Sequence, residues 1–298
     1  MWNKIKKGIR NPRLIALKLL NTKLARVLSD KIFINLEYRL KMKKKLNLNS
    51  PKTYNEKLQY LKLYDRKEEY TDLVDKIKVR DYIEKEIGSE YLIPVYGFWN
   101  SYEEIDFNKL PKSFVLKPNH TSGDVFICHD KSKINHKDLK KEIKRWLKRK
   151  YYWVHREWPY KNIEPQIYAE KLMKDNEYDE LLDYKFFCFD GKPELMFVAS
   201  ERHSDSGPKF DFFDLDFKRL DIVNGYPNSE AKIEKPRNFE KMIQLARQLS
   251  INKKHVRVDF YECNGNIYFG ELTFYHFSGT TAFVPEKWDY ILGDKIKL

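Results

Sequence analysis

The chain of 298 residues has little cysteine, no long apolar run and few acidic residues near its amino terminus. Its three cysteines, Cys128, Cys188 and Cys263, lack the spacing of a metal site, so we expect reduced thiols in a cytosolic protein. No apolar run approaches the roughly 18 residues that a membrane span needs. The apolar run 14–20 is interrupted by Lys18, which makes the basic amino terminus a poor signal peptide.

Positive charge is concentrated at one end of the chain. Residues 1–50 carry 14 Lys and Arg but only Asp30 and Glu37, and they account for +12 of the formal net charge of +13. The nearly neutral remainder argues against a nucleic-acid groove, so we expect no nucleic-acid partner. Residues 1–48 combine a loose apolar stripe with basic side chains, which predicts amphipathic helices. Such helices either lie on an anionic membrane surface or pack on the body with a solvated basic face, and the sequence leaves both interpretations open.

Near the carboxyl end, two strand-like runs flank the turn signal Asn264-Gly265 and predict a β-hairpin. Side chains alternate faces along a strand, so Arg257 and Asp259 share one face. A plain two-residue turn would put Glu271 on the opposite face. If the two carboxylates converge, the hairpin must have an odd loop or a bulge, and a three-residue loop that begins at Cys263 would satisfy this condition.

The charged face of this hairpin indicates a particular chemistry. Its neighbouring positions are aromatic and aliphatic on both strands, which indicates a sheet that is buried on at least one side. Buried acids need cations. Two acids beside an arginine suit a magnesium and phosphate site, because oxygen ligands hold Mg²⁺ and arginine clamps phosphate oxygens. A surface ion pair is the simpler alternative, and the pattern favours the metal site over it.

The segments Arg257-Val-Asp259-Phe-Tyr and Gly270-Glu271-Leu-Thr273-Phe resemble the metal-binding hairpin of the ATP-grasp superfamily. More narrowly, they resemble the TupA-like ATP-grasp family, whose amino-terminal signature is similar to Asn49 to Arg66. The resemblance extends over about residues 49–298 and implies an α+β ATP-grasp fold, in which two lobes close over a nucleotide behind a basic helical extension. We accordingly expect the extension over residues 1–70, the first lobe over 71–172, and the second lobe, with the hairpin, over 173–298.

The resemblance also implies ATP and Mg²⁺ as cofactors and indicates which residues bind them. Asp259 and Glu271, with Thr273 as a weak ligand, would hold the metal. Lys185 and Arg257 would act on the transferred group. The expected nucleotide-binding residues are Lys76 (with Lys78 as its rival), Lys117, Ser122, Gly123, Glu170, Lys171 and Leu172. The family pattern has glycines where this chain has Thr121 and Asp124 in the phosphate loop.

Candidate substrate residues come from three other places. Ser278 and Gly279 lie in a loop that presents hydrogen-bond donors to the acceptor in the superfamily. Arg202 follows a predicted strand at its end. His155 and Arg156 stand in an aromatic-rich segment, where they would meet an acidic group, although that segment is also typical of a loop that packs aromatic rings into a core.

The implied activity is a carboxylate–amine ligase that forms an amide through an acyl-phosphate. Its expected substrates are an acidic saccharide and an amine or amino acid, because TupA-like proteins are associated with bacterial cell-surface polysaccharides of the capsular or teichuronic type. The expected location is the cytoplasm, with the basic extension at the inner membrane face. Alternatives are an ATP-grasp sugar kinase and a degenerate saccharide-binding protein. A glycosyltransferase is less favoured, because Asp214-x-Asp216 is the only acidic pair of that type and is typical of a turn.

Overall fold

The computed structural model describes residues 12–176, 180–202, 204 and 207–298. The first eleven residues of the predicted basic extension lie outside these ranges. The helices are α2 (Pro12–Leu20), α3 (Asp30–Met42), α4 (Tyr54–Tyr64), α5 (Glu69–Val74), α6 (Val79–Glu86), α7 (His136–Leu147), α8 (Tyr152–His155), α9 (Phe239–Leu249) and α10 (Lys287–Lys295). Short 3₁₀ helices are η1 (Lys23–Val27), η2 (Ser89–Tyr91), η3 (Tyr102–Glu104), η4 (Lys131–Lys133), η5 (Trp158–Tyr160) and η6 (His276–Gly279).

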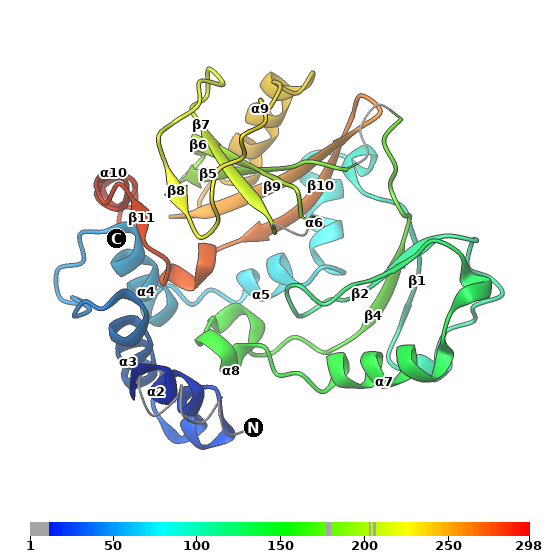
Figure 1. The fold of residues 1–298 in the computed structure, drawn as a ribbon, viewed down its shortest axis with the longest axis horizontal. Coiled ribbons are helices and arrows are strands. Elements are labelled where there is room, and N and C mark those ends of the chain that lie inside the picture. Colours follow the sequence, from blue (N-terminus) through cyan, green and yellow to red (C-terminus); the bar gives the residue numbers. More distant parts are fainter. Residues whose placement is uncertain (1–11, 177–179, 203, 205–206) are drawn as a thin grey trace.

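The strands form two main antiparallel sheets (Figure 1). The first has the order β1-β4-β2-β3 and the second the order β10-β9-β5-β6-β7, while β8 and β11 pair separately. In Figure 1, α7 runs along one side of the first sheet and α9 lies against the second. The strands are β1 (Val95–Trp99), β2 (Phe114–Pro118), β3 (Phe126–Cys128), β4 (Ile167–Glu170), β5 (Asp183–Phe189), β6 (Lys192–Ser200), β7 (Lys209–Phe213), β8 (Val223–Asn224), β9 (Val256–Cys263), β10 (Asn266–Thr273) and β11 (Phe283–Val284).

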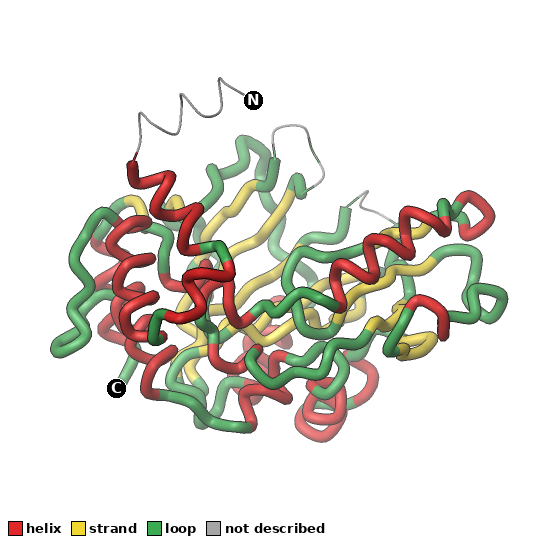
Figure 2. Tube along the Cα trace, turned by 90° about the horizontal axis from the view of Figure 1, so that it is seen from below, coloured by secondary structure: helices red, strands yellow, loops and turns green. Residues whose placement is uncertain are grey.

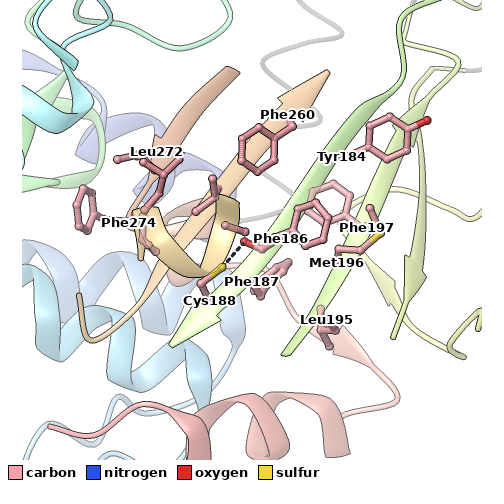
Figure 3. Close-up of a cluster of buried hydrophobic side chains, with 14 of the residues drawn as sticks. Tyr184, Phe186, Phe187, Cys188, Leu195, Met196, Phe197, Phe260, Leu272 and Phe274 are labelled. Carbon is pink, nitrogen blue, oxygen red and sulfur yellow. Dashed lines mark hydrogen bonds between the residues drawn. The ribbon is translucent and has the colours of Figure 1, made fainter. Parts of the chain in front are cut away.

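The core of the five-stranded sheet is rich in aromatic rings (Figure 3). Phe186 and Phe187 of β5 are fully buried and pack with Phe260 of β9 and Phe197 of β6. Burial of each such side chain contributes about 1.5–3 kcal/mol. Helices α4, α5 and α6 join the same cluster, so this core includes segments that precede the first sheet in the chain.

Two smaller clusters complete the interior. The four-stranded sheet packs against α7 through residues that include Leu116 and Trp146. The amino-terminal helices have their own cluster around Phe33 and Tyr38 of α3. The three cysteines are free and buried, as expected for reduced thiols. Among the described helices, none has both the length and the apolar character that crossing a bilayer requires.

Local sequence signals explain several boundaries. Thr53 and Glu56 form the capping box at the start of α4, where each side chain accepts a hydrogen bond from the other residue's backbone N–H. Asp190 and Gly191 make the turn between β5 and β6, and both have positive φ. Asp214 lies in a turn in which its carboxylate accepts hydrogen bonds from the N–H groups of Asp216 and Lys218, as the sequence predicts.

Candidate functional site

A cavity of about 1240 Å³ is lined by residues of both sheets, of α6 and of the loop after β2. It contains most of the residues that the sequence predicts for nucleotide and phosphate binding. Strands β2, β4, β5 and β10 each contribute lining residues, so folding brings together side chains that are far apart in the sequence. The predicted residues that line the cavity are Lys76, Lys117, Ser122, Gly123, Glu170, Lys171, Leu172, Lys185, Arg202 and Glu271.

The β9–β10 hairpin brings the two predicted metal-binding carboxylates together. Glu271 pairs directly with Asp259, so both side chains are on one face of the sheet. The expected three-residue loop is wrong, because Cys263 pairs with Asn266 and leaves a two-residue turn in which both residues have positive φ. The register shifts instead between Phe269 and Glu271, at a bulge. One extra residue on β10 therefore corrects the face of Glu271.

Arg257 connects the charged groups of the hairpin. Its Nε and Nη2 donate to the two oxygens of Asp259, each at 2.7 Å. Nη2 also donates to Thr273 Oγ1 at 3.0 Å and lies 3.2 Å from Glu271 Oε1. Asp259 is fully buried, so this bidentate pair replaces the water that an exposed carboxylate would bind.

The remaining guanidinium nitrogen of Arg257 points to a buried histidine. Nη1 donates to His276 Nδ1 at 2.7 Å, and His276 Nε2 lies 2.8 Å from Asn224 Oδ1. Burial and the charge of Arg257 hold the pKa of His276 well below its usual value. A neutral ring with its proton on Nε2 satisfies both contacts. His276 and Asn224 therefore orient Arg257.

Lys185 extends the cluster onto β5. Its Nζ lies 2.5 Å from Asp259 and 2.7 Å from Asp183. Burial alone would lower the pKa of Lys185, but Asp183 and Asp259 outweigh it and raise the pKa. Arg202 Nη1 lies 3.4 Å from Asp183, so both predicted cations share this acid. Asp183 is not among the predicted site residues, although it lies two positions from Lys185 on one strand, a spacing that places both side chains on the same face.

Two further lysines line the cavity, Lys117 on β2 of the four-stranded sheet and Lys76 between α5 and α6. Lys76 Nζ donates to the carbonyl oxygen of Thr121 at 2.6 Å, and Lys117 pairs with Glu170. Burial lowers the pKa of Lys76, and the negative charge of Glu271 opposes that shift. Burial would raise the pKa of Glu271, but Lys76, Lys185 and Arg257 together lower it to about 2. Glu271 is therefore ionised throughout the neutral range.

The phosphate-loop candidate lies over this group of lysines. Gly123 has a φ of 81°, and a Cβ placed there would have no atom within 4 Å, so the loop faces open space. Asp124 pairs with Arg149 Nη1 at 2.8 Å. The carboxylate that departs from the family pattern is thus paired with a cation two residues after α7. At the far end of β4, the backbone N–H of Lys171 donates to the carbonyl oxygen of Pro94.

Ser278 and Gly279, the predicted acceptor-binding residues, do not line the cavity. The Ser278 hydroxyl donates to Glu157 at 2.6 Å and accepts from Lys62 Nζ at 2.9 Å. Lys62 is fully buried, and Gln59 donates to the carbonyl oxygens of both loop residues. The structure therefore places this loop against α4, with its hydrogen-bonding groups directed into the protein.

His155 and Arg156 also lie away from the cavity. His155 pairs with Glu37 of α3 at 2.6 Å. Arg156 is buried, donates to the carbonyl oxygen of Ala25 at 2.9 Å and stacks on Trp153. These contacts hold α8 against the amino-terminal helices, so the structure places the two predicted substrate residues outside the cavity lining.

The donor set fits Mg²⁺. Asp259, Glu271 and Thr273 offer hard oxygen atoms. The described part of the chain has no group of three or more His, Cys, Asp and Glu that could hold a metal, so these residues do not form a complete protein cage. Mg²⁺ is commonly held by one or two carboxylates together with substrate phosphates, rather than by a complete protein cage. Glu271 lines the cavity, whereas Asp259 lies behind Lys185.

Several solved structures of ligases and synthetases are similar to this chain. The chain is similar to D-alanine–D-alanine ligase from Bacillus anthracis, solved with ATP, at 17% identity, over 75% of this chain and 64% of that one, with a TM-score of 0.45. It is similar to the same enzyme from Helicobacter pylori at 12% identity, over 84% of this chain and 70% of that one, with a TM-score of 0.41. The D-cycloserine synthetase DcsG matches at 13% identity, over 76% and 71% of the two chains, with a TM-score of 0.40. The chain thus spans less than two thirds of the first of these proteins, and no curated protein matches it.

A family match gives the stronger result. The family described as TupA-like ATPgrasp matches residues 56–297. This range includes both sheets, the cavity and the charged hairpin. The match confirms the expected family and α+β ATP-grasp fold, and it supports the expected class of enzyme. The protein belongs to the TupA-like ATP-grasp family.

Proposed function

We propose that this protein is an ATP-dependent carboxylate–amine ligase. The observation that carries the proposal is that Glu271, Lys76 and Lys185 line one cavity. Behind them, Arg257 and Asp259 form a bidentate pair that also contacts Glu271 and Lys185. Phosphoryl transfer requires positioning and charge neutralisation more than a covalent nucleophile of the protein. The cavity supplies both.

In the proposed reaction, a substrate carboxylate oxygen attacks the γ-phosphorus of ATP, and the bond from that phosphorus to the β,γ-bridging oxygen breaks. ADP leaves and an acyl-phosphate remains. The substrate amine then attacks the acyl carbon, phosphate leaves with the C–O electron pair, and the amine loses a proton to give the amide.

Each charged residue has a role in this scheme. Lys76 and Lys117 would neutralise the phosphates, and Arg257, oriented by His276, would hold the transferred group. Asp259 and Glu271 would hold Mg²⁺, which supplies positive charge to the phosphate oxygens. Lys185 pairs with Asp259 in the structure and lines the cavity, so it is positioned to exchange that carboxylate for a phosphate.

We propose an acidic saccharide of a bacterial cell-surface polysaccharide as the carboxylate substrate, and an amino acid or other amine as the second substrate. The support is family membership, together with the teichuronic-type polysaccharides associated with TupA-like proteins. The cations that line the cavity suit an acidic substrate beside the nucleotide.

The test begins with thermal shift in ATP and Mg²⁺. Ligand at 100 times its Kd should add about 2.7 kcal/mol of stability. Glu271→Gln should abolish the shift, whereas Glu194→Gln, a surface control, should retain it. Uronic acids and amines are then screened for products. An amide supports the ligase, a phosphate ester indicates a kinase, and saccharide binding without an ATP shift indicates a degenerate binding protein.

A further inference from the structure

The amino-terminal helices expose apolar side chains on the outside of the molecule. We call the exposed surface of residues 12–45 the α2–α3 face (Figure 2). On η1, Leu24 is 77% exposed and Val27 is 87% exposed. Leu19 of α2 and Ile32 and Leu36 of α3 are also exposed. Leu19 and Leu36 line the same groove, and contiguous exposed apolar surface is typical of interaction sites.

The same face is positively charged. Residues 12–45 contain ten basic side chains, eight of them exposed, and two acids. Both acids are directed inward, because Asp30 accepts from Arg66 at 2.6 Å and Glu37 pairs with His155. The exposed charge of this segment is therefore entirely positive.

Apolar and basic residues meet in one groove of this face. A groove of about 990 Å³ is lined by Leu19 of α2, by Leu36 and Arg39 of α3, and by Lys43 directly after α3. Residues three positions apart lie on one side of a helix, so Leu36 and Arg39 share one side of α3, and Lys43 follows at its carboxyl end. The groove thus has an apolar floor and a cationic rim.

We propose that the α2–α3 face docks the protein on an anionic lipid bilayer. Apolar side chains enter the interface between headgroups and acyl chains, while basic side chains contact lipid phosphates. Charge complementarity selects this occupant, because the exposed part of the segment has no acidic side chain to repel anionic lipid. The proposal does not depend on the ligase reaction.

Helix α7 provides an internal comparison. It exposes Lys137 and Lys141, and Lys148 is exposed directly after it, but its apolar residues, among them Ile143 and Trp146, are buried against the first sheet. It therefore has positive charge without exposed apolar surface. Figure 1 shows α7 apart from α2 and α3, so the two basic surfaces can be changed independently.

The experiment is flotation of the full chain with vesicles of phosphatidylcholine alone, or with about one-third phosphatidylglycerol. We expect binding to the anionic vesicles only, and a decrease as salt increases. Changing Lys18, Lys23 and Arg39 to Glu should weaken binding at least about tenfold. Changing Leu24 and Val27 to Ser should also weaken it, by about tenfold, at unchanged charge.

Matched controls separate this proposal from its rivals. Changing Lys137, Lys141 and Lys148 to Glu alters the charge by the same amount on α7 and at its carboxyl end, and should leave binding within about twofold. Changing Ile251 to Ser, on a different exposed surface, should have no effect. Equal losses from the α2–α3 and α7 charge variants would overturn the proposal, as would the absence of binding. A wild-type dimer that the Leu24 and Val27 changes convert to monomer would instead identify the face as a contact between two copies.

Discussion

Asp259 and Glu271 lie directly opposite each other across the β9–β10 hairpin, but only one of them is fully buried. Asp259 is enclosed by Arg257 and Lys185, whereas the side chain of Glu271 is 32% exposed. We expect Asp259→Asn to cost about 3–5 kcal/mol of the free energy of unfolding, because it leaves two buried cations without a full partner. Glu271→Gln should cost only about 1 kcal/mol.

Urea denaturation at neutral pH measures both losses. Glu194→Gln removes an exposed ion pair with Lys295 and should change stability by less than about 1 kcal/mol. Equal losses for Asp259→Asn and Glu271→Gln would contradict the different burial of the two carboxylates. Because Asp259→Asn is expected to lose more stability, Glu271→Gln is the better variant for testing nucleotide binding.

The sequence predicted the convergence of Asp259 and Glu271 but not its cause. An odd loop or a bulge would each place Asp259 and Glu271 on one face. The alternation of side chains along the strands therefore does not show which of the two is present. The turn itself is the two-residue form that Asn264-Gly265 favours, and the extra residue lies within β10. Lys76, Lys117 and Glu170 were likewise predicted, through the family resemblance, and all three line the cavity.

Contacts between distant parts of the chain could not be predicted in this way. Ser278 is held by Lys62 and Glu157, which are more than 100 residues away in sequence. Arg156 is buried by the amino-terminal helices, and its local sequence carries no signal of that contact. Such residues have the same local pattern whether they face a substrate or another helix, and only tertiary packing decides between the two.

The Asp124–Arg149 pair leads to a second prediction, on nucleotide affinity. Arg149→Met should weaken ATP binding by about fivefold, because it leaves the charge of Asp124 beside the phosphate loop. Asp124→Asn should not weaken binding, and in the double variant it should restore affinity. Isothermal titration with ATP and Mg²⁺ provides the double-mutant cycle. If the double variant binds ATP as weakly as Arg149→Met does, Arg149 contacts the nucleotide itself rather than acting through Asp124.

Lys62 gives the stability a dependence on alkaline pH. Burial lowers the pKa of Lys62 to about 8, although Glu157 and Glu37 oppose the shift. Between about pH 8 and 10.5 the unfolded chain therefore binds more protons at this site than the folded chain does, and stability rises with pH there. Over that interval the native protein should gain up to about 3 kcal/mol relative to Lys62→Met.

Urea denaturation of both proteins at several pH values isolates this contribution, because other titrating groups are shared. Lys161→Met, which removes an exposed lysine, serves as the control and should track the native protein across the range. A difference between the native protein and Lys62→Met that stays constant from pH 7 to about 10 would show that Lys62 titrates at its ordinary pKa.

Gly279 and Gly265 form a matched pair for the last prediction. Both have positive φ, at 62° and 76°, so alanine at either position strains the backbone by about 1–2 kcal/mol. They differ in the space around them. A Cβ on Gly279 would lie 2.4 Å from Gln59 Nε2 and 2.9 Å from Leu58 Cβ, whereas no atom lies within 4 Å of one on Gly265. Overpacking should therefore add about 1–3 kcal/mol to the cost of Gly279→Ala alone.

Thermal and urea denaturation of the two variants test this difference. Because η6 also includes His276, which orients Arg257, displacement of Gly279 from α4 should reach the charged hairpin. We therefore expect Gly279→Ala to reduce the ATP-dependent thermal shift and Gly265→Ala to leave it unchanged. Equal stability of the two variants would mean that α4 moves to accommodate the methyl group, and that the position of η6 does not depend on its close contact with Gln59 and Leu58.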